Sequence, residues 1–183
     1  MATRRSNTDY KSIKHRGVYG GREQSVTGII KIRAGETVAT TDLLQMIPLG
    51  ENVRPVDIAL HAVPTSGNPV LTGGGFNVGV VPWNSLPFKR PNGTEYPPIP
   101  VNASAFGNLV LPSGPLIVRT SAPSRPVATN VPNYAPYRVT LTPSATFSVA
   151  GGDIELSLTV TYVGEQIAEP YVYTDFLSQK VKN

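Results

Sequence analysis

The stretch from Asp153 to Val163 constrains the fold of this chain more than any other part of the sequence. Apolar and polar residues alternate strictly along it, and glycines bound it at both ends. The apolar positions are Ile154, Leu156, Leu158, Val160 and Tyr162. An alternation of period two is typical of a β-strand with one buried and one solvent-exposed face. Because one amphipathic strand cannot bury its apolar face alone, other strands must pack over it.

Further segments with strand patterns are separated by glycine and proline turns. They are residues 25–32, 53–63, 76–81, 137–141 and 146–149. The segment 41–47 fits either an extended stretch or a single helical turn before Pro48. About eight short strands with such turns predict an all-β, jelly-roll-like sandwich. We place this domain at residues 25–170, between an extended basic arm at 1–24 and a tail at 171–183 that begins with apolar residues.

Residues 82–136 hold twelve of the eighteen prolines. Because proline has no backbone N–H to donate, this region predicts long ordered loops. Short edge strands are expected near Ile99–Val101, Leu109–Leu111 and Leu116–Arg119. Loops of this size in a compact domain are often functional or interfacial. The region also carries the aromatic residues Trp83, Phe88, Tyr96 and Phe106, which could bind sugars, form oligomer contacts or cover the open end of the core.

The positive charge is concentrated at the start of the chain. Residues 1–33 carry eight basic and two acidic side chains, a net charge of +6, whereas the other 150 residues have a net charge of −2. The segment 1–24 shows neither helical nor strand periodicity. We interpret it as an arm that becomes ordered against a partner, with a solvated tail as the alternative.

The composition argues against catalysis. The chain has no cysteine, and it lacks the G-x-S-x-G motif of serine hydrolases. His61 and Asp57 share one strand face, which we interpret as an ordinary polar face. Asp153 and Glu155 also share a face, and we expect solvated carboxylates there. The sequence therefore predicts a protein that is not an enzyme and has no metal site or cofactor.

The chain contains no apolar run of the roughly 18 residues that a membrane span requires, and its first residues lack the core of a signal peptide. We therefore expect a soluble protein that is synthesised in a cytosol.

Several short motifs resemble those of small head-associated proteins of tailed bacteriophages. A strand, an Ala-Gly turn and a strand ending in Pro-Leu are followed by three further characteristic strands. The motifs are Ala34-Gly35, Ile47-Pro48-Leu49, Val56-Asp57-Ile58, Val78-Gly79-Val80 and Leu158-Thr159-Val160-Thr161-Tyr162. Together they cover about half of the chain, and the proline-rich middle departs from the pattern.

The resemblance implies a capsid decoration (cement) protein, which binds the outside of the major capsid protein shell and stabilises it. It further implies a homo-oligomer, a dimer or trimer, located on the capsid surface of the virion after synthesis in the host cytoplasm. The basic arm would then dock on the capsid, and neither a membrane nor nucleic acid is expected as a partner. The main docking residues would be Arg4, Arg5, Lys11, Lys14, Arg16 and Arg22.

Two other functions fit the same sequence. A basic arm before a jelly roll also resembles the self-assembling coat proteins of small RNA viruses, in which the arm neutralises packaged nucleic acid. The aromatic residues of the proline-rich region would instead suit a carbohydrate-binding module on a phage tail or fibre.

Overall fold

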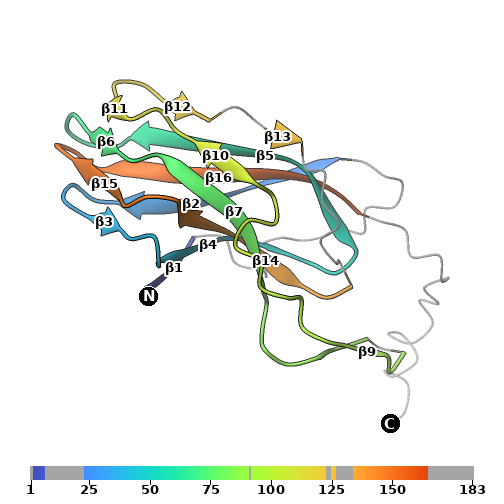
Figure 1. The fold of residues 1–183 in the computed structure, drawn as a ribbon. Helices are drawn as coiled ribbons and strands as arrows, with labels where there is room; N and C mark the ends of the chain where they lie inside the picture. Colours follow the sequence, from blue (N-terminus) through green and yellow to red (C-terminus); the bar gives the residue numbers. More distant parts are fainter. Residues whose placement is uncertain (1, 7–22, 91, 123–124, 127–133, 165–183) are drawn as a thin grey trace, which may run out of the picture.

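The computed structural model describes residues 2–6, 23–90, 92–122, 125–126 and 134–164. Every regular element in this part of the chain is a β-strand (Figure 1). The described residues include no helix of the length and hydropathy that crossing a membrane would need. The all-β class expected from the sequence is confirmed.

Two main sheets form the sandwich. The first sheet has the order β1 (Thr3–Arg5), β4 (Leu43–Leu49), β14 (Tyr137–Pro143), β7 (Gly75–Pro82) and β10 (Asn108–Val110). The second has the order β12 (Thr120–Ser121), β5 (Val53–Pro64), β16 (Ile154–Gly164) and β2 (Gln24–Ile32), and β13 (Arg125–Pro126) also pairs with β5. The apolar face of each sheet needs a cover, and the other sheet provides it.

A smaller sheet closes one end of the sandwich. Its order is β11 (Gly114–Pro115), β6 (Val70–Thr72), β15 (Phe147–Ala150) and β3 (Thr37–Val38). Each of these strands lies on a connection that carries the chain from one main sheet to the other, and they gather at the left end in Figure 1.

The pairing of the main strands is that of a jelly roll. The first main strand, β2, pairs with the last, β16, and the pairs β4 with β14, β5 with β12 and β7 with β10 are nested inside it. A long hairpin rolled into two sheets produces this nesting, which is the two-Greek-key arrangement of a jelly roll. The jelly-roll-like sandwich is therefore confirmed by the topology.

Strand β16 behaves as its sequence predicts. Ile154, Leu156, Leu158 and Val160 are fully buried and Tyr162 is nearly so. On the opposite face, threonine hydroxyls meet across to β2, where Thr27 Oγ1 lies 2.8 Å from Thr159 Oγ1. Burying an aliphatic side chain of this size stabilises the fold by about 2 kcal/mol. The strand lies between β5 and β2 and thus in the middle of the second sheet.

Of the two alternatives for residues 41–47, the extended one is correct, and two other local expectations need correction. Residues 43–49 form strand β4 rather than a helical turn, and Pro48 lies beyond Leu43–Gln45, the part of β4 with which β1 pairs. Residues 99–101 are not a strand, although Asn102 makes a single bridge to Val80. The strand expected over 116–119 is replaced by the short strands β11 and β12 on either side of it.

Candidate interaction surfaces

The first described residues of the chain attach to its own sandwich. Strand β1 pairs in parallel with Leu43–Gln45 of β4. The guanidinium of Arg4 lies 2.9 Å from the carboxylate of Glu36, and the backbone N–H of Ala2 donates to Asp42 Oδ1 at 2.7 Å. Residues 2–6 are thus held by the chain's own sandwich, whereas the sequence predicted an arm that is ordered only against a partner. Of the other predicted docking residues, Lys11, Lys14, Arg16 and Arg22 lie outside the described residues.

Backbone and side-chain donors hold Glu36 in its charged form. The backbone N–H of Arg33 donates to its Oε2 at 3.1 Å, and the Arg4 guanidinium donates to the same atom. These two hydrogen bonds, the first the larger, lower the pKa of Glu36. The Arg4–Glu36 pair therefore stays ionised at neutral pH and fixes β1 to the turn before β3.

A groove of about 470 Å³ lies beside β1, and we call it the basic groove. Its lining residues are Arg4, Arg5, Ser6, Ile29, Ile30, Lys31 and Glu155. The ammonium of Lys31 lies 3.5 Å from Glu155, and its side chain is 77% exposed. Arg5 is exposed and forms no ion pair with any described residue. Arg4 is paired with Glu36 and Lys31 with Glu155, so among the described residues the groove has an excess of one positive charge, that of Arg5.

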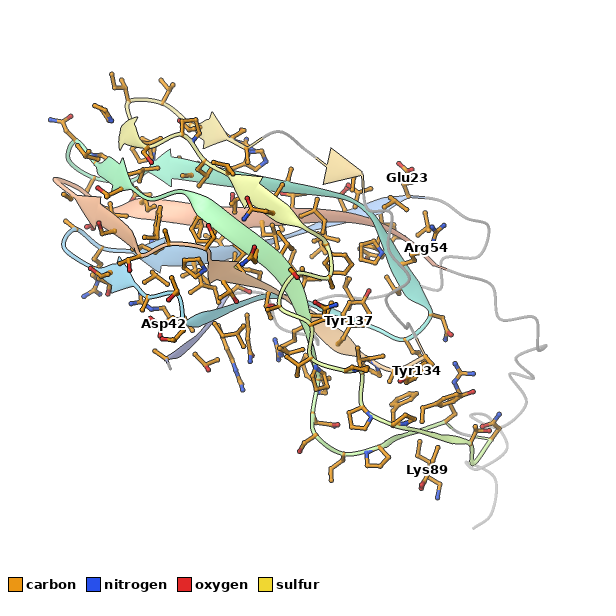
Figure 2. All side chains as sticks on the ribbon, viewed as in Figure 1. Glu23, Asp42, Arg54, Lys89, Tyr134 and Tyr137 are labelled. Atoms are coloured by element: carbon orange, nitrogen blue, oxygen red, sulfur yellow. The ribbon has the colours of Figure 1, made fainter. Side chains whose placement is uncertain are left out.

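A hairpin of β8 (Phe88–Lys89) and β9 (Glu95–Tyr96) projects from the sandwich at the foot of β7 (Figure 1). The ring of Tyr96 stacks on Tyr134 with 5.3 Å between centroids, and the guanidinium of Arg90 lies 4.7 Å from the Tyr96 centroid. Figure 2 shows Tyr134 where the hairpin meets the sandwich, and Lys89 on the outer side. The hairpin is thus fixed by aromatic stacking rather than by a core of its own.

Beneath the hairpin lies a pocket of about 250 Å³, which we call the aromatic pocket. It is lined by Pro82, Trp83, Asn84, Leu86, Phe88, Pro98, Ala135 and Pro136. The backbone N–H of Trp83 donates to the carbonyl of Pro136 at 3.2 Å and joins two of its walls. The guanidinium of Arg138 covers the Trp83 ring at 4.0 Å, and Leu86 is 68% exposed.

The structure brings three of the four predicted interface aromatics to this end of the molecule. Trp83 and Phe88 line the pocket, and Tyr96 pairs with Phe88 across the hairpin. Phe106, in contrast, is 6% exposed and belongs to the core. For Phe106, covering the core is therefore the correct interpretation.

An ion pair at the base of the hairpin has no sequence signature. Arg90 Nη2 donates to Asn52 Oδ1 at 3.1 Å, and Arg90 Nε lies 3.5 Å from Glu51 Oε2. The side chains of Arg90 and Glu51 are 11% and 25% exposed. Burial raises the pKa of Glu51, and the positive charge of Arg90 opposes this only in part. The two residues are 39 positions apart in the sequence, so only the folded chain brings them together.

The polar pairs considered from the sequence do not form a catalytic site. His61 Nδ1 lies 2.6 Å from Ser121 Oγ, but Asp57 is four residues away along β5, about 13 Å at the rise of a strand. Burial and the charge of Arg119 lower the pKa of His61. Asp153 accepts the backbone N–H of Ala34, and Glu155 pairs with Lys31. Among the described residues, no group of three or more His, Cys, Asp or Glu could hold a metal ion.

No family model and no curated protein sequence matches the chain. Among solved structures, it is similar to a chain of the capsid of Ralstonia phage GP4, with a TM-score of 0.45 and 14% identity over 80% of this chain and 87% of that one. It is also similar to a chain of the cyanophage Pam1 capsid asymmetric unit, with a TM-score of 0.39 and 15% identity over 79% and 86%. Neither likeness is close enough to transfer a function.

Proposed function

We propose that the chain is a structural protein of a tailed-phage virion, a decoration protein that binds the outside of the major capsid protein shell. The observation that carries the proposal is the basic groove beside β1. Its excess of positive charge suits an acidic surface or segment of a partner protein, and the resemblance of the chain's motifs to those of phage head-associated proteins suggests the class of partner. Decorating a symmetric shell repeats one modest contact many times, which gives avidity without a tight single site.

The groove offers two kinds of contact. Strand β1 is the outer strand of the first sheet, and an outer strand presents unpaired backbone donors and acceptors to which an extended segment can add. Arg5 and Lys31 lie beside that edge and would pair with carboxylates of the added segment. Further cations at 11, 14, 16 and 22 follow β1 in the sequence and would extend the same contact.

Reversal of one charge in the groove tests the proposal. We expect Arg5→Glu to weaken co-sedimentation with empty capsids of the phage that encodes the chain roughly fivefold, which corresponds to about 1 kcal/mol for one exposed ion pair. Because salt screens such contacts, the loss should shrink as the ionic strength rises. The matched control is Arg119→Glu, an exposed arginine beside β12 at the opposite edge of the second sheet. Equal binding by Arg5→Glu and the unmodified chain would refute the role of the groove.

The aromatic pocket favours carbohydrate binding as a second candidate function. Trp83 and Phe88 line a hollow at the tip of the molecule, where a sugar ring could lie against an aromatic face. Arg138 already covers one face of the Trp83 ring, however, and a sugar would have to use another surface. Glycan binding that is abolished by Trp83→Ala would favour this function over capsid decoration.

A further inference from the structure

We infer that the aromatic pocket is the docking site of the chain's own segment 171–177, bound by the same copy of the protein. The segment lies outside the described residues, and the proposal does not depend on the function proposed above. The pocket presents apolar walls at the surface, with Leu86 68% exposed at its rim. An apolar hollow of this kind gains stability when another apolar group covers it.

The described chain ends at the same end of the sandwich as the pocket. Gly164, the last residue of β16, pairs with Val53, and the carbonyl of Val53 accepts a hydrogen bond from Tyr137 Oη at 3.1 Å. Ala135 and Pro136, which directly precede Tyr137, form one wall of the pocket. Residues 165–170 reach up to about 20 Å when extended, so segment 171–177 starts within range of this wall.

The composition of the segment matches the pocket and its surroundings. Five of its seven residues are apolar or aromatic, namely Tyr171, Val172, Tyr173, Phe176 and Leu177. A hollow of about 250 Å³ is smaller than the usual site for a free ligand and suits one or two large side chains delivered by a chain. Its proline-rich walls are already rigid, so docking orders little else.

The charges match as well. Residues 165–177 carry Glu165, Glu169 and Asp175 and no basic residue. At the pocket, the guanidinium of Arg138 covers the ring of Trp83. Figure 2 shows Arg54 at the same end of the sandwich. The acidic charges of the connection therefore complement the arginines near the pocket, which favours docking of this segment.

The chain contains one tryptophan, Trp83, whose emission therefore reports on the pocket alone. In the full chain, we expect Tyr171→Ala/Phe176→Ala to raise the acrylamide quenching constant of Trp83 roughly twofold, because the contacts that exclude water are lost. The control Val181→Ala, in the same tail beyond the segment, should leave it unchanged. Equal quenching in all three proteins would overturn the proposal, as would emission that changes with dilution, since same-copy docking is independent of concentration.

Cross-linking gives a second test that does not depend on fluorescence, because the chain has no cysteine of its own. Leu86→Cys/Phe176→Cys should oxidise to a disulfide within one chain, which reductant-free electrophoresis detects as a faster-migrating monomer. The control Ile117→Cys/Phe176→Cys uses an 84% exposed residue next to β11, at the other end of the sandwich, and should stay reduced. Disulfide-linked dimers from the Leu86 pair would show that the segment comes from a second copy, and failure to cross-link would refute the site.

Discussion

At the scale of single residues, the ion pair of Glu51 and Arg90 at the base of the β8–β9 hairpin has a consequence for how stability depends on pH. Their nearest atoms are 3.5 Å apart, and neither Glu51 Oε2 nor Arg90 Nε has a hydrogen-bond partner among the described residues. This contact is too loose to offset the cost of burying the carboxylate, which explains why the pKa of Glu51 is raised above its ordinary value of 4.5.

A pH-dependent loss of stability follows for the unmodified chain. A carboxyl whose pKa is higher in the folded than in the unfolded chain binds its proton more tightly when folded, so stability falls as the pH rises above about 4.5. We expect Glu51→Gln to remove this contribution, so that its denaturation midpoint falls less than that of the unmodified chain between pH 4 and pH 7. Glu95→Gln, at an exposed residue of the same hairpin, is the control. Identical pH dependence for Glu51→Gln and the unmodified chain would show that ionisation of Glu51 does not lower the stability of the fold.

At the scale of secondary-structure elements, β2 and β4 close the sandwich where Gly28 meets the backbone of Met46. A Cβ atom at position 28 would lie 2.3 Å from the Met46 carbonyl oxygen, a backbone atom that cannot rotate away. We expect Gly28→Ala to lower the free energy of unfolding by about 1–3 kcal/mol, the usual cost of overpacking. Urea denaturation measures the change.

Gly35 provides the matched control for this glycine. It has a φ of 81° in the turn before β3, and nothing lies within 4 Å of a Cβ placed there. Asparagine tolerates this backbone conformation, so Gly35→Asn should change stability by less than about 1 kcal/mol. If both variants lost equal stability, the contact between β2 and β4 would not be what requires glycine at position 28.

Local periodicity accounts for what the sequence predicted at this scale. The alternation in 153–163 correctly identified the buried face of β16, because that pattern depends only on neighbouring residues. The burial of Phe106 depends instead on contacts with a strand that is distant in the sequence. Its backbone N–H donates to Val78 O at 2.9 Å, and Gly79 has no side chain to keep the loop at 102–103 off β7. No local pattern in the proline-rich region distinguishes Phe106 from Trp83.

For the basic groove and the aromatic pocket too, the sequence predicted some of the residues but not which distant residues lie beside them. Arg4 and Arg5 stand out in the sequence as part of a basic arm, but the pairing of β16 with β2 is what brings Lys31 and Glu155 together beside them. The aromatic pocket joins residues 82–98 to 135–136, which are distant in the sequence. The aromatic residues of the proline-rich region predicted an interaction surface there. The sequence could not predict which residues form the walls of the pocket, because the pairing of β14 with β7 brings them together.

At the scale of the whole molecule, three exposed apolar residues lie close together at the end of the sandwich that the smaller sheet closes. Ile117 and Val118 are 84% and 70% exposed between β11 and β12, and Val70 of β6 pairs in register with Pro115 of β11. Apolar side chains grouped on a surface mark sites where a protein meets another protein. They favour contacts between copies at this end, whereas the basic groove lies along the β1 edge.

The oligomeric state separates a decoration protein from a self-assembling coat. Arg4 is already paired with Glu36, and the body of the chain is slightly acidic, so few cations remain to neutralise a packaged genome. We expect light scattering of the purified protein to give two or three times the chain mass of 19.5 kDa, with a 260/280 absorbance ratio typical of protein alone. Ile117→Ser/Val118→Ser should shift the mass toward one chain, while Val101→Ser, at a residue 69% exposed elsewhere, should not. A megadalton particle that carries nucleic acid would instead identify a coat protein, because only a chain that closes a shell around a genome produces one.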